Sequence, residues 1–377
     1  MLKRIYVDNF KCLVNFELNL DSKNLFLGTN GVGKSTVLYV LSKLQRFLTR
    51  NEKIVDVFPP KEKTLWQQKN IQLFELDVVS NEGLYKYVVE IEHDPNPNNG
   101  NARLRKESLH LDDKVLFSFK TEKKGNYSEG IGYLYNDYSN SETDGLPFSF
   151  NWFYSGLGNV QERHDNKKLV GFKEWLNSLQ VIKINTDAIS SESEKEEERL
   201  CYNTSNYFSW LRYLSQSKRR YFTKLERELS EIVSGFEIFN FEPSGYKKIL
   251  ELEFSNKIKY GFDGLSDGQK ALIVLYTLLY CSPDNSVLCI DEPENFLALP
   301  EIQPWLDLIY DLCEENKTQV ILISHHPKII NWLANKHGHW FSKQEGGYIR
   351  VQRLVAENND TGLPISDLVE RGWIYEP

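Results

Sequence analysis

The alternation of apolar and polar residues predicts a strand-rich first part of the chain. Period-two alternation covers residues 2–9 and 13–20, and a short apolar strand follows at residues 25–27. Antiparallel strands are predicted for four further stretches, residues 71–79, 84–92, 104–111 and 115–119. Residues 120–151 are rich in Gly, Ser, Asn, Asp and Tyr, a composition that predicts long loops or poorly ordered hairpins.

The last part of the chain combines helical spacing with short buried strands. Apolar residues recur at helical spacing over residues 207–233, which predicts one long helix or two shorter ones. Three strands are predicted near residues 236–241, 249–254 and 258–262. Helices at residues 271–279 and 301–313 then alternate with strands at residues 287–290 and 319–323. This alternation predicts a parallel α/β sheet.

One stretch between a strand and a helix carries a specific chemical signature. Residues 28–35 fit G-x-x-x-x-G-K-[ST], the phosphate-binding P-loop. Glycines allow a tight turn that points backbone N–H groups at phosphate oxygens, and the helix N-terminus adds positive partial charge. Lys34 is expected to bridge the β- and γ-phosphates, and the Ser35 hydroxyl to hold Mg²⁺. The predicted nucleotide-binding residues are Gly28, Asn30, Gly31, Gly33, Lys34, Ser35 and Thr36.

A pair of carboxylates follows the apolar strand at residues 287–290. Asp291 at the strand tip is expected to hold Mg²⁺ through water, and Glu292 to activate the water that attacks the γ-phosphate. Acidic residues at strand ends are common, so this pair alone is a weak signal. The pair becomes a specific signal because it follows, along the chain, a P-loop and a Leu-Ser-Asp-Gly-Gln stretch at residues 265–269.

Together these motifs resemble an ATPase of the ABC superfamily, in the branch of the RecF, SMC-type and OLD-like proteins. Residues 265–269 resemble the ABC signature, Asp291-Glu292 the Walker B pair, and Ser324-His325 the switch histidine. The motif Asp-Glu-Pro-Glu-Asn at residues 291–295 is similar to the corresponding motif of the OLD-like group, whose members often serve in phage defence. No Asp-x-Asp pair occurs in the chain, so no Toprim-type nuclease site is expected.

The resemblance implies an α/β ABC-type P-loop ATPase head with a parallel core sheet, an antiparallel side sheet and a small helical lobe. The expected division is residues 1–164 and 246–377 for the head and residues 165–245 for the lobe. ATP is then sandwiched in a head-to-head homodimer, or a higher oligomer.

Several site residues follow from the resemblance alone. Ser266, Gly268 and Gln269 of one subunit would face the γ-phosphate held by the other, with His325 as the catalytic switch. Lys11 stands where SMC-type heads place a basic residue near the nucleotide, although this role is no better supported than a structural one.

The chain also departs from the family pattern at two places. Ala298-Leu299 stands where OLD-like relatives often carry His-Pro, so the loop that crosses the dimer interface is expected to differ. The family pattern also includes a glutamine that lines the Mg²⁺ site, between the P-loop and the signature. Gln67 and Gln68 are the candidates here, but they fit a solvated pair of residues before a strand better than this role.

Composition limits the environment and the partners. The chain has 377 residues, a net charge of −8 and five scattered cysteines, and it lacks a long apolar run. A cytoplasmic location without membrane contact is expected. The first residues of the chain are expected to form a strand rather than a signal peptide. The basic cluster at residues 218–227 fits a nucleic-acid backbone or a solvated helix face equally well. His337 and His339 suit a surface turn better than a metal site.

The sequence therefore predicts a Mg²⁺-dependent ATPase that acts as a dimeric switch. The leading hypothesis is the ATPase component of a bacterial anti-phage system with a separately encoded nuclease or toxin as effector. The alternative is a RecF-like repair or replication-gap ATPase that binds duplex DNA itself. A transporter subunit is disfavoured, because the motifs are similar to soluble SMC-like heads.

Overall fold

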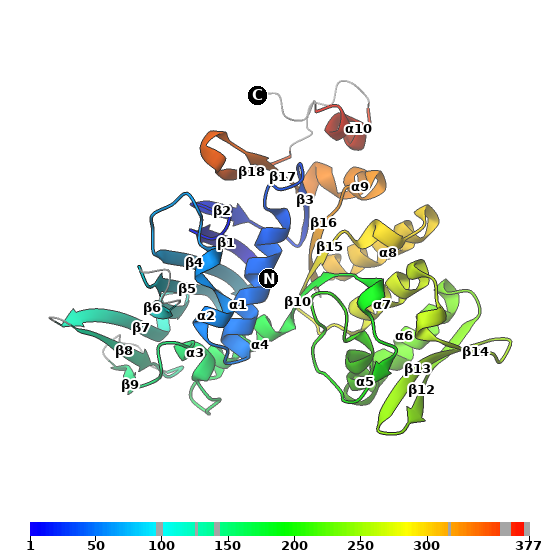
Figure 1. The fold of residues 1–377 in the computed structure, drawn as a ribbon, viewed down its shortest axis with the longest axis horizontal. Helices are drawn as coiled ribbons and strands as arrows, with labels where there is room; N and C mark the ends of the chain where they lie inside the picture. Colours follow the sequence, from blue (N-terminus) through cyan, green and yellow to red (C-terminus); the bar gives the residue numbers. More distant parts are fainter. Residues whose placement is uncertain (96–100, 125–126, 139–143, 316–317, 355–362, 373–377) are drawn as a thin grey trace. The chain divides into compact units, whose positions relative to one another are not determined.

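The computed structural model describes residues 1–95, 101–124, 127–138, 144–315, 318–354 and 363–372 (Figure 1). Backbone contacts divide the chain into two units. Unit 1 comprises Met1–Leu179 and Lys336–Val355, and unit 2 comprises Gln180–Asn335 and Ala356–Pro377. The domain boundaries expected near residues 164 and 245 stay a prediction.

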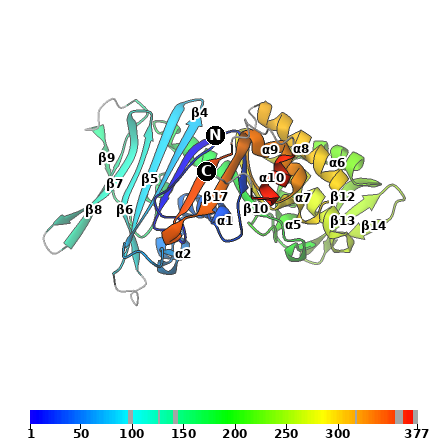
Figure 2. The ribbon, with the colours of Figure 1, turned by 90° about the horizontal axis from the view of Figure 1, so that it is seen from above.

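An antiparallel sheet of eight strands makes up much of unit 1, and its long strands lie side by side in Figure 2. Its spatial order is β2-β1-β4-β5-β6-β7-β8-β9. Alternate residues of β4 are buried, as the period-two pattern requires when one face of a sheet is covered. The strands are β1 (Leu2–Asp8), β2 (Phe16–Asn19), β4 (Ile71–Ser80), β5 (Gly83–His93), β6 (Ala102–Leu111), β7 (Lys114–Lys124), β8 (Tyr127–Leu134) and β9 (Leu146–Phe148).

Residues 120–151 were expected to form long loops or hairpins, and the structure has antiparallel hairpin strands there: β7 continues to Lys124, and β8 and β9 follow. The glycines that suggested loops make room for aromatic rings in the sheet. A Cβ on Gly130 would lie 2.6 Å from the ring of Phe119, and one on Gly132 would lie 2.8 Å from the Phe148 carbonyl oxygen. Glycine here serves close packing between strands rather than chain reversal. Residues 139–143 lie outside the described part of the chain.

The remaining elements of unit 1 include the strand and the helix that flank the P-loop. Strand β3 (Lys23–Leu27) is buried throughout and leads through the P-loop into α1 (Lys34–Thr49). Strand β17 (Gly338–Lys343) pairs in parallel with β3, and β18 (Ile349–Arg353) pairs antiparallel with β17. Three further helices are α2 (Ile54–Val57), α3 (Gly156–Asn159) and α4 (Lys167–Ser178).

Unit 2 contains a parallel strand pair and a lobe with a second sheet. Strand β15 (Ser286–Asp291) lies between β10 (Leu179–Lys183) and β16 (Thr318–Ile323), and β15 and β16 are parallel and fully buried. The lobe sheet consists of β11 (Glu192–Ser193), β12 (Phe236–Ser244), β13 (Lys247–Phe254) and β14 (Lys259–Gly261). The helices are α5 (Tyr207–Ser217), α6 (Arg219–Ile232), α7 (Asp267–Cys281), α8 (Leu299–Glu314), α9 (Pro327–His337, whose last residues belong to unit 1) and α10 (Ile365–Glu370).

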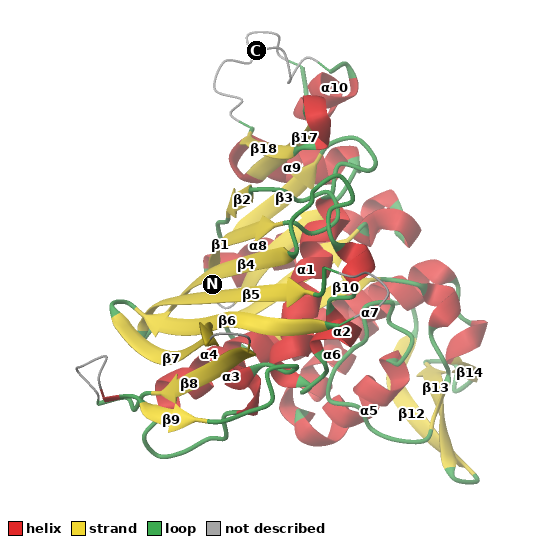
Figure 3. Cartoon of the chain, turned by 60° about the vertical axis from the view of Figure 1, so that its left-hand side comes forward, coloured by secondary structure: helices red, strands yellow, loops and turns green. Residues whose placement is uncertain are grey.

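The predicted helical stretch at residues 207–233 is two helices, because Lys218 (φ −127°) interrupts the helical backbone between α5 and α6. Figure 3 shows the mixture of strands and helices that the sequence led us to expect. The predicted α/β fold class is confirmed, with a parallel β15–β16 pair and a separate antiparallel sheet. Within the described residues, no helix combines the length and apolar character needed to cross a membrane.

Candidate functional site

The P-loop of unit 1 has the backbone conformation that its glycines permit. Gly28, Gly31 and Gly33 have φ angles of 137°, 81° and 88°, in a region that side chains with a Cβ rarely adopt. A Cβ on Gly28 would lie 2.4 Å from the backbone oxygen of Phe341 in β17, and one on Gly33 would lie 2.9 Å from Cys12 Sγ. A Cβ on Gly31 would meet nothing within 4 Å. Two glycines thus allow close packing, and the third lies beside open space.

The polar side chains of the P-loop differ in exposure. Lys34 is buried, and its Nζ donates to the carbonyl oxygens of Gly28 (2.6 Å) and Thr29 (3.0 Å). Asn30 and Ser35 are exposed, and Thr36 is half-buried. The open backbone at Gly31, the exposed hydroxyl of Ser35 and the start of α1 at Lys34 fit a phosphate group with an associated hard cation.

Lys11 lies in a strained turn that contacts the P-loop through its neighbour Cys12. Asn9 and Lys11 have φ angles of 61° and 48°, which are unusual for residues other than glycine. The Lys11 N–H donates to the Glu62 carbonyl oxygen at 2.8 Å, and its Nζ lies 4.1 Å from the centre of the Tyr39 ring. The structure therefore brings the Lys11 turn close to the P-loop in unit 1, and the role of Lys11 toward a nucleotide stays a prediction.

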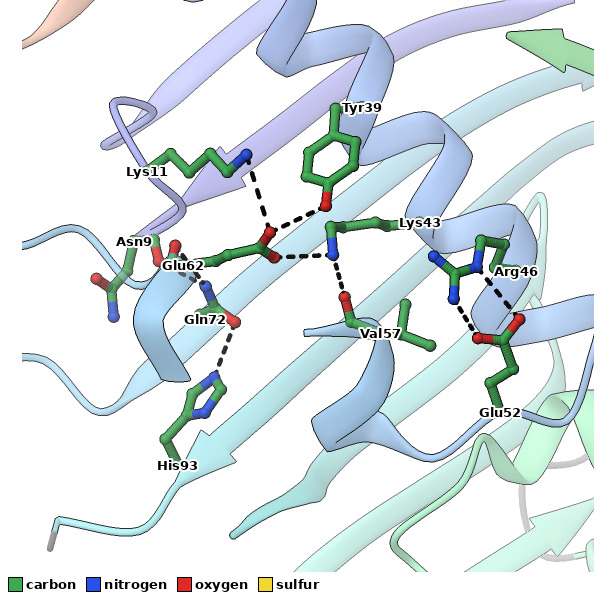
Figure 4. A network of polar contacts seen from close by, with 10 residues as sticks. All are labelled: Asn9, Lys11, Tyr39, Lys43, Arg46, Glu52, Val57, Glu62, Gln72 and His93. Carbon is green, nitrogen blue, oxygen red and sulfur yellow. Dashed lines mark hydrogen bonds and ion pairs between the residues drawn. The ribbon is translucent and has the colours of Figure 1, made fainter. Parts of the chain in front are cut away.

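Beneath Lys11, a buried network centres on the carboxylate of Glu62 (Figure 4). Glu62 accepts a hydrogen bond from Tyr39 Oη at 3.0 Å and pairs with Lys43 Nζ at 2.8 Å and Lys11 Nζ at 3.8 Å. Burial, and then the hydrogen bond to Glu62, raise the pKa of Tyr39 to about 12. Burial lowers the pKa of Lys43, and the Glu62 carboxylate opposes this shift. These groups hold the Lys11 turn against α1.

The same figure shows how Gln72 supports this turn. Its Nε2 donates to the Asn9 carbonyl oxygen at 3.0 Å, and its Oε1 lies 2.8 Å from His93 Nε2. Burial lowers the pKa of His93 to about 4, so the ring is neutral at pH 7. Gln67 lies nearby in sequence, with its Oε1 buried and without a hydrogen-bond partner among the described residues, while Gln68 is exposed.

In unit 2, the acidic pair follows β15 with an unusual backbone. Asp291 is 2% exposed and ends the buried strand. Glu292 adopts left-handed angles (φ 54°, ψ 59°), and its N–H donates to the Ile323 carbonyl oxygen at 2.9 Å. Left-handed backbone at a residue with a side chain costs free energy and tends to occur at functional sites. The strain directs the chain sharply from β15 into the following 3₁₀ turn (Pro293–Phe296).

Two residues that the sequence did not single out contact this acidic pair. Lys183 Nζ, at the end of β10, lies 2.9 Å from Glu292 Oε2 and 3.9 Å from Asp291 Oδ2. Tyr202 Oη donates to Asp291 Oδ2 at 3.4 Å, and the Tyr202 carbonyl oxygen accepts from the Lys183 N–H at 2.7 Å. The hydrogen bond from Lys183 is the main reason that the pKa of Glu292 is lowered. Burial and then the charge of Asp291 raise the pKa of Tyr202, which keeps its hydroxyl protonated.

His325 is held through a third carboxylate in unit 2. Glu294 Oε1 accepts from Ser324 Oγ at 2.7 Å and from the His325 N–H at 3.0 Å. The loop after β16 is thereby tied to the turn after β15, and the His325 side chain is exposed. The second glutamate of the Asp-Glu-Pro-Glu-Asn motif, Glu294, thus positions the predicted switch histidine.

The predicted signature residues begin α7. Ser266 is its N-cap, and it forms a capping box with Gln269. A Cβ on Gly268 would lie 2.9 Å from the Phe296 carbonyl oxygen, so this glycine packs closely on the turn after Glu292. Unit 2 therefore brings Ser266, Gly268 and Gln269 next to the turn that contains the acidic motif.

His337 ends α9, and His339 lies on β17. His339 is 4% exposed, and its Nε2 lies 3.1 Å from Asn24 Oδ1. Burial lowers the pKa of both histidines, that of His339 to about 4. Among the residues that the structure describes, no group of three or more His, Cys, Asp or Glu side chains could hold a metal ion.

The chain is similar to one protein family and to solved SMC head structures. The family described as "AAA domain, putative AbiEii toxin, Type IV TA system" matches residues 23–331. A structure titled "SmcHead bound to the C-winged helix domain of ScpA" has a TM-score of 0.55 and 13% identity, over 94% of this chain and 98% of that chain. The SMC head domain from Thermotoga maritima has a TM-score of 0.46 and 14% identity, over 93% and 98%.

No curated protein sequence matches the chain. At 13% identity, the SMC-head structure shows a similar fold and no more. The family match covers most of the chain, from the strand before the P-loop to α9. The chain belongs to the AAA-domain ATPase family described as putative AbiEii toxin, Type IV TA system.

Proposed function

We propose that the chain hydrolyses ATP with Mg²⁺ and uses the reaction as a conformational switch in bacterial phage defence. One observation carries the ATPase part of this proposal. It is the P-loop of unit 1, where Gly31 leaves space beside a left-handed backbone at the start of α1. Such a turn before a helix suits a phosphate, because backbone N–H groups and the helix N-terminus favour negative charge there.

Each site residue has a chemical role in this proposal. Lys34 leaves the carbonyl oxygens of Gly28 and Thr29 and binds the β- and γ-phosphates instead. Ser35 and Asp291 would hold Mg²⁺, which neutralises phosphate charge when bound. Glu292 accepts a proton from the attacking water, and His325 contacts the γ-phosphate region.

The reaction site is proposed to be shared between two copies of the chain. Ser266, Gly268 and Gln269 lie at the N-terminus of α7, where backbone N–H groups suit an anion. In the proposal they meet the γ-phosphate held by the P-loop of a second subunit. ATP then favours the closed dimer and hydrolysis favours the open one, so the nucleotide shifts the population of the two states.

The defence role rests on the family and on one motif. The family description names a putative toxin of a type IV toxin–antitoxin system. The Asp-Glu-Pro-Glu-Asn motif at residues 291–295 is similar to that of OLD-like defence ATPases. We propose a cytoplasmic OLD-like ATPase without a Toprim domain, which controls a separate nuclease or toxin. A RecF-like repair ATPase would share the reaction but act on DNA directly.

Two variants test the shared site. Lys34→Ala damages the P-loop side, and Ser266→Arg damages the signature side. Each should be nearly inactive alone, whereas mixed dimers contain one site with both lesions and one intact site. ATP turnover should therefore return in part after mixing and subunit exchange. Full activity of either variant alone, or no recovery after proven exchange, would contradict the shared site.

A second experiment tests the separation of switch and effector. Homogeneous protein should hydrolyse ATP but leave plasmid, linear DNA and RNA intact with Mg²⁺ or Mn²⁺. Nuclease activity or toxicity should require the copurifying partner and should be lost with Lys34→Ala. Cleavage by the purified chain alone would show that it is itself an effector.

A further inference from the structure

The start of α6 carries a group of cations, which we call the basic elbow. It comprises the half-buried N-cap Lys218 and the exposed Arg219, Arg220 and Lys224, with the exposed Tyr221 and Thr223 between them. In the chain as a whole acidic residues prevail, with a net charge of −8. A concentrated positive surface in an acidic protein therefore needs an explanation of its own.

Two neighbouring carboxylates form their hydrogen bonds and ion pair with groups outside the basic elbow. Glu226 is turned toward β12, where it accepts a hydrogen bond from the Phe239 N–H at 3.1 Å. Glu228 pairs with Arg227 at 2.8 Å and accepts from Tyr280 Oη at 3.1 Å. The sequence left open whether the cluster is a solvated helix face or a nucleic-acid site, and in the structure both glutamates contact other groups.

The acidic run at residues 192–198 is also engaged elsewhere in unit 2. Glu192 pairs with Lys247 at 2.9 Å, and Glu196 lies 3.7 Å from Arg212 in α5. Within the described ranges, no ion pair within 4.0 Å joins Lys218, Arg219, Arg220 or Lys224 to a carboxylate. The Nζ of Lys224 instead lies 5.0 Å from the centre of the Tyr280 ring.

The position of these cations is unfavourable for the free helix. Lys218 is the N-cap of α6, Arg219 and Arg220 follow it, and the first turn contains no acidic residue. Cations at a helix N-terminus oppose the helix dipole, whereas an anion there is stabilised. A bound anion would therefore turn a destabilising arrangement into a favourable one.

We propose that the basic elbow binds the phosphate backbone of duplex DNA. Arg, Lys, Tyr and Thr side chains and helix N-termini are the groups that contact phosphates in protein–DNA complexes. Arg219 and Arg220 supply planar donors that pair well with phosphate oxygens. The site lies in the α5–α6 part of unit 2 (Figure 1), and its binding does not depend on the ATPase assignment.

The same lobe offers a matched control. Lys247, Lys257 and Lys259 are cations of the lobe sheet that pair with Glu192, Glu237 and Glu242. The test variant R219Q/R220Q/K224Q and the control variant K247Q/K257Q/K259Q each remove three positive charges. They differ in whether the removed cations have carboxylate partners.

The experiment measures binding of a 30-base-pair duplex, without nucleotide, over a range of salt concentrations. The test variant should bind at least about tenfold more weakly, and its log–log salt slope should decrease by about 2 to 3. The control should bind within about twofold of the unmodified protein. The thermal unfolding temperature and the ATP turnover of both variants should stay unchanged. If the triple variant does not fold, the single variants R220Q and K224Q should each reduce the log–log salt slope of duplex binding by about 1.

Several results would overturn the proposal. Absence of duplex binding by the unmodified protein, or equal losses in both variants, would remove the basic elbow as a specific site. Preference for single-stranded RNA over the duplex, or stronger competition by polyglutamate than by DNA, would identify a different anionic partner and reject duplex DNA.

Discussion

The P-loop of unit 1 and the acidic motif of unit 2 differ in how their geometry arises. The P-loop conformation is set mostly by glycines within residues 28–33, whose φ angles only glycine adopts readily. The acidic motif depends on partners far away in sequence, because Lys183 and Glu292 are separated by 109 residues. A contiguous motif can therefore encode one part of a site, whereas another part is assembled by the sheet.

The largest effect is expected at the proposed general base. Glu292→Gln keeps the shape and removes the basicity, so ATP turnover should fall by about 10²- to 10⁴-fold. ATP binding should persist, because Lys34 and Asp291 are unchanged. Turnover and light scattering with ATP would check this result, together with the accumulation of an ATP-locked dimer. Nearly normal turnover would remove Glu292 as the base.

The next variant tests whether the P-loop conformation depends only on its own glycines or also on the neighbouring strand β17. Gly28→Ala places a Cβ 2.4 Å from the Phe341 backbone oxygen, at a φ of 137°. We expect the free energy of unfolding to decrease by about 2–4 kcal/mol, because the substitution introduces both backbone strain and a clash with a backbone atom. Gly31→Ala is the matched control, with strain only, and should cost about 1 kcal/mol. Equal shifts in denaturant midpoint would show that β17 does not constrain the loop.

A smaller effect is expected when the distant partner of the turn is lost. Glu294→Ala removes the acceptor for Ser324 Oγ and the His325 N–H. Hydrogen bonds to a charged group contribute about 1.5–3 kcal/mol. If part of this energy positions His325 for the reaction, turnover should fall by about 3- to 30-fold with little change in ATP affinity. Glu301→Ala, at the start of α8, is a control carboxylate that should leave turnover unchanged.

The smallest expected change concerns Lys183. Lys183→Met removes the cation from Glu292 Oε2, and Lys183→Arg retains a positive charge. A half-exposed ion pair contributes about 0.2–1 kcal/mol, and this contact must open before Glu292 meets the attacking water. Lys183→Met should therefore raise turnover by about 1.5- to 5-fold, with KM for ATP unchanged and the Arg variant close to the original rate. A fall in turnover would instead give Lys183 a supporting role in the reaction.

Part of the fold could be read from the chain directly. Strands β4, β5 and β6 were expected because their apolar residues alternate, and a sheet with one covered face requires this pattern. The sequence does not decide between loops and hairpins at strand β8, because Gly130 and Gly132 resemble loop residues. Their packing against Phe119 and Phe148 appears only when the strands pair. The apolar spacing of α5 and α6 is nearly continuous, so the sequence does not reveal the break at Lys218.

The sequence by itself determined the P-loop, the order of the motifs and the α/β class, because these depend on local backbone preferences and on periodic burial. Tertiary structure alone decided that Lys183 and Tyr202 contact the acidic pair and that Glu294 holds Ser324 and His325. It also decided that Glu226 bonds to the Phe239 N–H rather than to the basic elbow. The physical reason is that charge pairing depends on distance in space. Hydrophobic burial fixes which segments meet, and only then do distant polar groups acquire partners.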